Sequence, residues 1–479
     1  MQVQSDKKIA IVGGGIAGSS IALYLGELGL HVTLFEKKDS LVDGPPICHL
    51  HAGGNLYREI SDEQCITLLK ESIELIQLYP CAVDFRPTLI AVPTEDKGNP
   101  EDLYPRLKKL KKEYQSLIDK DITNRVLGSV DDYYKTYDRE AVEKLKSMDV
   151  IDRPISFDEW MIPAVKNIDL DKIKFPLVMV QEYGLNLFRL AASVSLALEF
   201  SDNVNVLKST FVKDIKKKNN LYALEYEKDD SLHVDKFDYL INAAGFKSGE
   251  IDDMLGFDRE RFVEFKAAYV TKWKDTTLWP EIIFHGERGT PRGMAQFTPY
   301  PGGYFQLHGM TEDITLFKDG LVKSQNSSAQ PKLNQKYIDK IYKGWREVDV
   351  SKRSKLAISH LSQYIPSFES ATITSKPLFG AQQIPGDDAS LRAAEVSFDS
   401  DSYARCEIVK ASSVLSMADA IVTKLVDLGF INKSAKGFRD FKNNKQFLEE
   451  DITKLAQKLC EQRNYPKCLA FRYNSSLIV

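Results

Sequence analysis

Six consecutive residues near the start of the chain have the composition and spacing of a phosphate-binding loop. Gly13, Gly15 and Gly18 match the pattern G-x-G-x-x-G. The first glycine permits a tight turn, the second lets the backbone approach a pyrophosphate, and the third lets a helix pack closely on a sheet. A helix N-terminus at this point also attracts negative charge. The cofactor contacts that this loop predicts are Gly13, Gly15, Ile16, Ala17 and Gly18.

An acidic residue stands where the second strand of this motif ends. Residues 9–12 and 31–35 have the apolar character of strands, and residues 19–28 between them have that of a helix. Together they form one βαβ unit, and Glu36 follows it directly. A carboxylate here accepts hydrogen bonds from both ribose hydroxyls, which favours an unphosphorylated ribose, and neighbouring Lys37 is a further expected contact. FAD and NAD both fit this motif, and the single glycine fingerprint predicts one dinucleotide rather than two.

The overall composition describes a folded protein without a bias toward polyanions. The chain has 479 residues, 43% of them hydrophobic and 28% charged, with a formal net charge of -4. This length favours two lobes around a shared site. Nucleic-acid binding needs a concentrated basic surface, so we expect no nucleic acid as partner. The six cysteines lack the spacing of zinc ligands or of a disulfide framework, so we expect no metal and a reducing, cytoplasmic location.

No stretch of the sequence has the length and apolar character of a transmembrane helix. The nearest candidate, residues 185–198, contains Asn186, Arg189 and two serines. The polar start, residues 1–8, leads directly into a strand and does not resemble a secretory signal. We therefore expect any membrane contact to be peripheral.

Regular patterns that return after a long charged stretch indicate a discontinuous first domain. Residues 187–199 are typical of an apolar helix, and the apolar strand 239–242 leads into Ala243-Ala244-Gly245, which returns the chain to the first sheet. Val212, within the strand-like residues 204–215, is an expected cofactor contact. The segments predicted to form the Rossmann-type cofactor-binding domain are residues 1–90, 176–260 and 376–430.

The remaining segments are expected to form a second lobe and two peripheral parts. Residues 91–175 are rich in Lys, Asp, Glu and Tyr, and we predict a helical surface excursion there. Residues 261–375 begin with strand-like patterns and predict an antiparallel substrate domain. Residues 407–428 have the spacing of a long helix, and residues 431–479 are typical of a polar, mostly helical tail without evident chemistry.

Four segments, in this order, resemble those of the D-amino-acid oxidase and sarcosine oxidase superfamily of FAD enzymes, within a framework of residues 8–428. They are the glycine loop, the loop 48–58, the strand that ends at Ala244-Gly245, and the segment 407–413. The resemblance implies FAD as the cofactor and an α/β, glutathione-reductase-like FAD fold. A Rossmann-type FAD-binding domain would then lie beside an antiparallel-sheet substrate domain. Covalent and non-covalent attachment of FAD are both left open.

The resemblance also implies which residues hold the substrate and the flavin. In this superfamily the second segment runs along the flavin and carries a carboxylate-binding arginine, which falls on Arg58. A lysine that shares this task falls on Lys410, and backbone amides of the last long helix face the flavin. Both side chains are therefore expected to bind the substrate carboxylate. The further cofactor contacts implied are Gly53, Gly54, Asn55, Ala244, Gly245, Ser412 and Ser413.

Two histidines are further candidates for proton transfer. His51 lies in the flavin loop, and His308 lies on a strand that resembles the one whose side chains face the flavin. The register of that strand decides whether His308 faces the flavin or the core. The sequence departs from the superfamily at two points. Cys406-Glu407-Ile408 replaces its Gly-His-Gly, and the strand lysine that promotes oxygen attack has no evident counterpart, with Gln306 or His308 nearby.

The predicted activity is that of an FAD-dependent oxidoreductase that transfers a hydride to the flavin from a small carboxylate-bearing amine or amino acid. Oxygen, a quinone and a protein are all open as electron acceptors. The first alternative is a 2-hydroxy-acid dehydrogenase that passes electrons to a quinone or a protein carrier. The second is a flavoprotein subunit or maturation factor that depends on a partner. An aromatic hydroxylase is a third alternative. Such an enzyme would carry a Gly-Asp motif just before its last flavin-contacting segment, whereas Gly386-Asp387 lies about twenty residues before the helix expected at Lys410.

Overall fold

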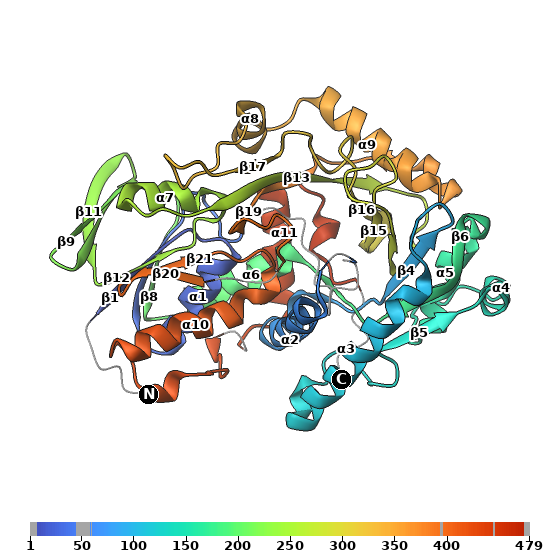
Figure 1. Cartoon of the computed structure of the whole chain (residues 1–479), viewed down its shortest axis with the longest axis horizontal. Coiled ribbons are helices and arrows are strands. Elements are labelled where there is room, and N and C mark those ends of the chain that lie inside the picture. The colour runs from blue at the N-terminus through green and yellow to red at the C-terminus, as the bar shows by residue number, and fades with distance from the viewer. Residues whose placement is uncertain (1–6, 45–57, 59, 393–395, 444–445, 474–479) are drawn as a thin grey trace.

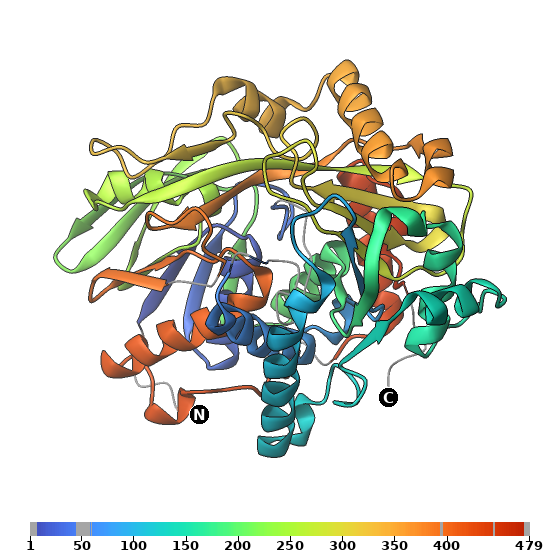
Figure 2. The same ribbon diagram turned by 45° about the vertical axis from the view of Figure 1, so that its right-hand side comes forward.

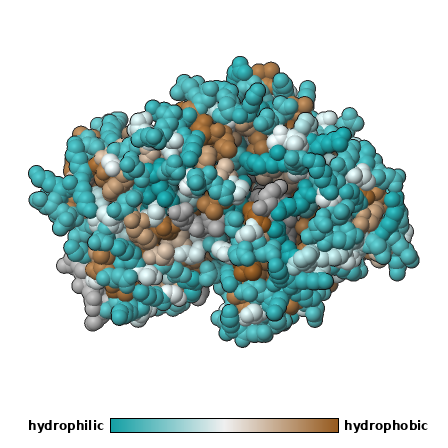
Figure 3. Space-filling view, in the orientation of Figure 1, coloured by the Kyte–Doolittle hydropathy of each residue, from teal (hydrophilic) through white to brown (hydrophobic). Residues whose placement is uncertain are grey.

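Two sheets of different kinds organise the molecule, which is a computed structural model. Figure 1 shows the first sheet at the lower left and the second along the top and right, with the long strand β13 (Arg261–Lys272) running above both. The face seen in Figure 3 is mainly hydrophilic, with apolar groups in scattered patches. The structure describes residues 7–44, 58, 60–392, 396–443 and 446–473.

The first sheet is the mainly parallel sheet expected for a dinucleotide-binding domain. Its six strands have the order β20-β21-β12-β1-β2-β8, and β1 lies between two parallel neighbours. All pairs in it are parallel except that of the edge strand β20 with β21. Apolar side chains occupy both faces of β1, because helices cover one face and a three-stranded sheet covers the other. The strands are β1 (Lys8–Val12), β2 (His31–Phe35), β8 (Val204–Leu207), β12 (Tyr239–Asn242), β20 (Val396–Ser400) and β21 (Tyr403–Cys406).

Five helices pack on one another and on one face of this sheet. Ser61 caps the N-terminus of α2, where its hydroxyl accepts a hydrogen bond from the Gln64 amide. Helix α1 contacts α6 and α10, and α11 lies along α6. These helices share one hydrophobic core with the strands. They are α1 (Ile16–Glu27), α2 (Asp62–Leu78), α6 (Leu187–Glu199), α10 (Val414–Asp427) and α11 (Glu449–Gln462).

A three-stranded meander, β9 (Phe211–Lys218), β10 (Leu221–Lys228) and β11 (Ser231–Phe237), covers the other side together with α7 (Ser248–Leu255). Each of its hairpins has a two-residue loop, Asn219-Asn220 in the first and Asp229-Asp230 in the second, and all four residues have positive φ. Asn and Asp tolerate this conformation, which two-residue hairpins with the favoured twist require.

The second sheet is mixed and has ten strands. Its main path is β17-β13-β16-β15-β14-β4-β6-β5, and β18 and β19 also pair with β13. Most pairs are antiparallel, and β14 with β4 is a parallel pair. Its remaining strands are β4 (Thr88–Pro93), β5 (Tyr134–Tyr137), β6 (Ile173–Val180), β14 (Glu281–Phe284), β15 (Ala295–Tyr300), β16 (Tyr304–Gly309), β17 (Leu321–Lys323), β18 (Thr372–Ile373) and β19 (Leu378–Pro385).

The two faces of this sheet differ in chemistry. On the outer face, Phe265 and Leu307 belong to a core cluster with Trp160 of α5 (Phe157–Asn167) and Leu361 of α9 (Glu347–Ser362). Alternate residues of a strand point to opposite faces, and directly paired residues share a face. The inner face, which packs through Ala268 and Val270 on the first lobe, therefore carries a polar set. This set includes Glu264, Lys266, Gln296, Thr298, Gln306, His308 and Gln382.

The expected surface excursion at residues 91–175 is partly wrong. Strand β5 and the start of β6 belong to the ten-stranded sheet, and Trp160 is 1% exposed. Charged residues of α3 (Tyr104–Lys120) and α4 (Arg139–Lys146) dominate the composition of this stretch. For this reason the composition does not predict that the following helix, α5, is buried. Helix α3 extends toward the lower edge of both ribbon views (Figure 1 and Figure 2).

The long helix expected at residues 407–428 is also corrected. Residues 403–406 form strand β21, a short 3-10 turn follows at Ala411–Ser413, and α10 begins at Val414. The Glu407 side chain is fully buried against two arginines, which holds the chain in an extended conformation there. No helix within the described residues combines the length and apolar character needed to span a bilayer. Four further elements are β3 (Val83–Asp84), β7 (Gly184–Leu185), α8 (Gln335–Lys343) and the 3-10 helix Lys467–Ala470.

Candidate cofactor and substrate site

A cavity of about 770 Å³ opens where the parallel strands of the first sheet end. Val12 of β1, Phe35 of β2 and Ala243 after β12 line it. The carboxyl ends of parallel strands are the usual ligand site of such sheets, and this volume is typical of a site for a large organic ligand. The lining also includes Gly13, Gly15, Glu36, Lys37, Lys38, Asp43, Phe188, Val212, Ala244, Gly245, Tyr342, Lys376, Gly380 and residues 462–465.

The glycine loop has the geometry that its sequence requires. Gly13 has φ 106°, and a Cβ there would lie 2.3 Å from the Ala243 carbonyl oxygen. A Cβ on Gly18 would lie 1.9 Å from the Gly13 carbonyl oxygen, so α1 and the loop are in close contact. At Gly15 no heavy atom of the described residues lies within 4 Å of the Cβ position. This residue is the N-cap of α1, so the first amides of the helix are open to a phosphate.

Glu36 lies at the edge of the cavity and holds the loop. Its Oε2 accepts a hydrogen bond from the Gly14 amide at 2.7 Å, and its Oε1 accepts one from the Lys38 amide at 2.8 Å. Burial raises the pKa of this carboxyl, against the opposing effect of these amides and of Lys37 and Lys38. The position suits a ribose, as the sequence predicts, and the contact with Gly14 gives the carboxylate a second task.

An apolar wall next to Glu36 suits a flat ring system. Phe35, Val212 and Ile251 supply apolar surface, and Tyr342 of α8 adds an aromatic ring. Lys37 Nζ donates to the Tyr342 hydroxyl at 2.7 Å and lies 4.7 Å from its ring centroid. The N-terminus of α1, the Glu36 carboxylate and this apolar wall therefore lie at one cavity. Together they fit an adenine dinucleotide.

In the second lobe, the inner face of the ten-stranded sheet concentrates positive charge around Glu264. Lys266 Nζ lies 2.8 Å from Glu264 Oε2, and the Arg288 guanidinium contacts the other carboxylate oxygen. Burial opposes ionisation of Glu264, but Lys266 and Arg288 outweigh it and lower its pKa. Burial lowers the pKa of Lys266, and the charges of Arg392 and Arg288 add to this effect. Gly380, the residue paired with Lys266, lines the cofactor cavity.

A second charged group lies at the end of β14. The Arg58 guanidinium donates to both oxygens of Asp96, at 2.6 and 2.8 Å. His285 is 3% exposed, and neither ring nitrogen has a hydrogen-bond partner among the described residues. Burial lowers the pKa of His285 to about 3, and the charge of Arg58 contributes. The imidazole is therefore neutral at physiological pH and retains its hydrogen-bonding capacity.

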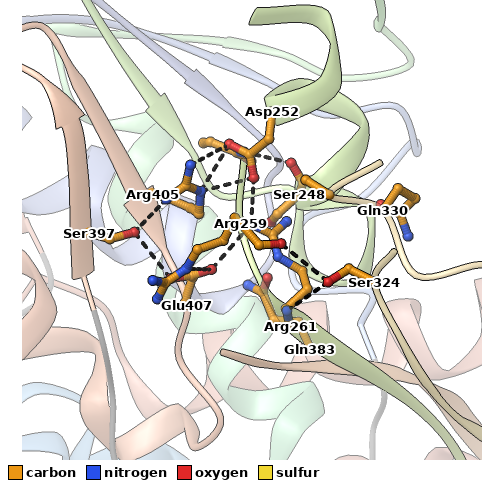
Figure 4. Close-up of polar contacts among 12 residues, drawn as sticks. Ser248, Asp252, Arg259, Arg261, Ser324, Gln330, Gln383, Ser397, Arg405 and Glu407 are labelled. Atoms are coloured by element: carbon orange, nitrogen blue, oxygen red, sulfur yellow. Dashed lines mark hydrogen bonds and ion pairs between the residues drawn. The ribbon is translucent and has the colours of Figure 1, made fainter. Parts of the chain in front are cut away.

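A buried network of arginines and carboxylates fixes the chain just before Lys410. Figure 4 shows Arg405 and Asp252 facing each other, with Glu407 beside Arg259. Arg405 Nε donates to Asp252 Oδ1 at 2.9 Å, and Arg259 Nη2 donates to Glu407 Oε2 at 2.7 Å. Arg261 of β13 contacts both carboxylates. The network thus joins β21, α7 and β13, and it positions the turn that leads to α10.

Comparison with known proteins agrees with this geometry. Residues 8–137 match a family described as FAD dependent oxidoreductase. The fold is similar to that of L-amino acid deaminase from Proteus vulgaris (TM-score 0.59, 12% identity, 93% of this chain and 99% of that chain). It is also similar to that of glycine oxidase from Geobacillus kaustophilus (TM-score 0.55, 11% identity, 92% of this chain and 100% of that chain). A third similar structure is the FAD complex of glycerol-3-phosphate dehydrogenase from Bacillus halodurans (TM-score 0.55, 12% identity, 96% of this chain and 73% of that chain). No curated protein matches the chain in sequence.

The family match over residues 8–137 supports the resemblance to FAD-dependent oxidoreductases that the sequence predicts, and the fold of the chain is similar to the solved structures named above. The matched family is FAD-dependent, in agreement with the cofactor expected from the sequence, and the Rossmann-type sheet beside a mixed, mainly antiparallel sheet is the fold expected from the sequence. The glycine loop and Glu36 have the positions expected for residues that hold the adenosine diphosphate half of FAD.

Most of the predicted cofactor contacts lie at the cavity. Gly13, Gly15, Glu36, Lys37, Val212, Ala244 and Gly245 line it, and Ile16, Ala17 and Gly18 form the first turn of α1. Ser412 and Ser413 are buried in the 3-10 turn before α10 and are not among the lining residues described. The Ser413 hydroxyl donates to buried Glu71 at 2.6 Å, so this side chain ties α10 to α2. Gly53, Gly54, Asn55 and His51 lie outside the described residues.

The predicted substrate-binding side chains have different surroundings. Arg58 lies beside Asp96, so the carboxylate-binding face of its guanidinium is already occupied. Lys410 is half-buried and precedes the 3-10 turn, so it lies outside the helix expected to begin at 407. His308 is half-buried on the inner face, directly paired with Gln296.

The group around Glu264 was not predicted from the sequence. Glu264 and Lys266 are two residues apart in a strand whose intervening Phe265 is buried in the apolar outer core. Charged residues at every second position of an otherwise apolar strand place those charges on one face. That pattern was a usable signal. Arg288 and Asp96 come from loops, where the sequence gives no register.

Proposed function

We propose that this oxidoreductase oxidises a small amine or amino acid that carries an acidic group. The observation that carries the proposal is the excess of positive charge on the inner face of the second sheet, where Lys266 and Arg288 both pair with one carboxylate, Glu264. Buried charges are costly unless they are paired. An anionic substrate group would compensate the excess cations, and binding would be favoured by that compensation.

The chain supplies binding and orientation for this reaction. Arginine donates in a planar fork that suits a carboxylate, and a buried lysine acts as a compact point charge. Lys266 and Arg288 would hold the acidic group, and this would fix the neighbouring carbon relative to the flavin. FAD, when bound, accepts the hydride from that carbon. Water then hydrolyses the released imine to a carbonyl compound and an amine.

The row of polar side chains on the inner face of the second sheet supports the proposal. Gln296, Thr298 and Gln306 provide hydrogen-bonding groups on adjacent strands, and His308 lies in the same row. Each of these side chains stands on a strand rather than a loop, which keeps its position precise. His308 would be the candidate for accepting a proton from the substrate amine. Two similar folds belong to proteins named L-amino acid deaminase and glycine oxidase, which is consistent with an amino-acid substrate.

A second candidate is the oxidation of an alcohol that carries a carboxylate or phosphate. Lys266 and Arg288 also suit a phosphate monoester, because both Arg and Lys bind phosphate. The similar fold of glycerol-3-phosphate dehydrogenase is consistent with this alternative. The two candidates differ in the atom bound to the oxidised carbon, nitrogen in the first and oxygen in the second.

Anaerobic mixing of the FAD-loaded protein with matched substrates tests the proposal. The panel pairs each amino acid with its 2-hydroxy acid and includes N-methyl amino acids and glycerol phosphate. We expect an amino or N-methylamino acid to bleach the flavin absorbance and to release ammonia or methylamine. Bleaching by a hydroxy acid or by glycerol phosphate, with no reaction of any amine, would replace the proposal with the second candidate.

A further inference from the structure

The segment that follows α11 forms part of the cofactor cavity. Gln462, Arg463, Asn464 and Tyr465 are among its lining residues, although they lie far along the chain from the glycine loop. The Tyr465 hydroxyl donates to the Pro377 carbonyl oxygen at 2.8 Å, next to Lys376, another lining residue. Part of the tail expected from the sequence to have no chemistry therefore lies at the cofactor cavity.

Arg463 makes a dense set of contacts with the turn after β2. Its Nη2 donates to the Leu41 carbonyl oxygen at 2.8 Å and to Ser40 Oγ at 3.1 Å. Its Nη1 donates to the Val42 carbonyl oxygen at 3.1 Å, and its Nε lies 3.4 Å from Asp43 Oδ1. The Arg463 side chain is 8% exposed. One buried guanidinium thus holds four consecutive residues.

The turn that Arg463 holds is strained and contacts the glycine loop. Val42 has φ 53°, a left-handed conformation that a β-branched residue rarely adopts. Its amide donates to the Gly14 carbonyl oxygen at 2.8 Å, and the Leu41 side chain lies against Gly14. Such a conformation persists when surrounding contacts fix it, and it often marks a functional site. Arg463 supplies these contacts from a distant part of the chain.

We propose that Arg463 is a positioning residue of the FAD site, which holds the turn at residues 40–43 against the phosphate-binding loop. The segment 462–465 then forms one wall of the FAD cavity, and bound cofactor shields it from solvent. This inference concerns FAD binding and is independent of the substrate proposed above. The ligand of the segment is then the FAD molecule with its pyrophosphate, which the turn and the segment contact together.

Contacts farther along the segment explain how Arg463 is held in place. Asn186 Nδ2 donates to the Leu469 carbonyl oxygen at 2.8 Å, and the Tyr473 amide donates to Asp84 Oδ1 at 3.0 Å. The backbone amide of Trp279 donates to the Tyr473 hydroxyl at 2.6 Å. The segment is therefore anchored on both lobes, and Arg463 acts from a fixed backbone.

The test compares two buried arginines of the same segment. Arg472 is 6% exposed at its side chain and donates to the Pro80 carbonyl oxygen at 2.6 Å, but it is outside the lining set. We expect Arg463→Met to weaken FAD binding by the FAD-free protein about tenfold or more, with Arg463→Lys intermediate. Arg472→Met is expected to keep the wild-type dissociation constant. Equal weakening in both methionine variants, or none in Arg463→Met, would overturn the proposal.

Hydrogen exchange of the unmutated protein provides the second measurement, which does not depend on variants that fold. Backbone amides at residues 463–465 should exchange more slowly in the FAD-loaded protein than in the FAD-free protein. Amides at residues 14–19, in the glycine loop and first turn of α1, serve as the positive control. Protection of the loop without any change at 463–465 would contradict the assigned role.

Discussion

The amide of Gly14 donates to the carboxylate of Glu36 at 2.7 Å, so the acidic residue at the end of β2 holds the phosphate-binding loop as well as facing the cavity. Glu36→Gln keeps the size of the side chain and removes its charge. Because a charged hydrogen bond contributes about 1.5–3 kcal/mol, FAD should bind this variant about tenfold or more weakly. Flavin fluorescence titration of the FAD-free protein measures the constant. The control is Glu140→Gln, an exposed change on α4, which should leave the dissociation constant of FAD unaltered.

Alanine at two glycines of the loop should separate folding from cofactor binding. A Cβ at Gly18 would lie 1.9 Å from backbone oxygen, so Gly18→Ala should reduce the free energy of unfolding by about 1–3 kcal/mol through overpacking. Gly15 has open space at the Cβ position and an ordinary φ of -66°, so Gly15→Ala should fold as the wild type does. The new methyl group should nevertheless obstruct the pyrophosphate.

Thermal denaturation with and without FAD checks this pair. Gly15→Ala should keep the denaturation midpoint of the FAD-free protein and lose most of the increase that FAD produces. A normal increase with FAD in that variant would show that Gly15 does not face the cofactor.

Removal of the Lys266 charge should weaken substrate binding more than it changes folding. Lys266→Met deletes one of the cations around Glu264 and should raise the apparent dissociation constant of an acidic substrate about tenfold or more. Rapid anaerobic reduction of the flavin over a range of substrate concentrations gives that constant. Lys274→Met, an exposed change just beyond β13, is the matched control. An unchanged constant in Lys266→Met would remove this lysine from the substrate site.

Buried His285 should make stability depend on pH in the acidic range. Burial lowers its pKa in the folded state to about 3, from an ordinary value of 6.5. Between these values the unfolded chain binds a proton that the folded chain does not, so stability falls as the pH falls below 6.5. The loss amounts to about 1.4 kcal/mol per pH unit.

Urea unfolding at pH 7.5 and at pH 5.5 measures this effect. His285→Asn cannot titrate there, so it should lose about 1.4 kcal/mol less stability than the wild type between the two pH values. Identical losses would show that His285 is protonated in the folded protein at pH 5.5.

Local sequence patterns predict the elements around the cofactor well, because each is determined by nearby residues. The glycine loop, α1 and Glu36 lie within one βαβ unit, and the helix expected at 187–199 is α6 with the same bounds. The substrate side depends on contacts between distant residues. Asp96 reaches Arg58 from a loop, and no local pattern connects them.

The errors have physical causes of the same kind. Apolar residues at helical spacing continue backward from α10 to residue 407, but the burial of Glu407 with Arg259 and Arg261 holds that stretch extended. The polar composition after residue 431 suggests a solvated tail, whereas Arg463 is buried by its hydrogen bonds to backbone carbonyls. In both cases ion pairs and hydrogen bonds between distant segments outweigh local pattern.

The most direct test of the central claim is the anaerobic rate of flavin reduction by an amino acid and by its uncharged carboxamide. The two compounds share the C–N bond to be oxidised and differ in the acidic group that Lys266 and Arg288 are proposed to hold. The account predicts that the acid bleaches the FAD-loaded protein and that the amide needs at least about tenfold more substrate for the same rate. Equal reduction by both compounds would contradict it.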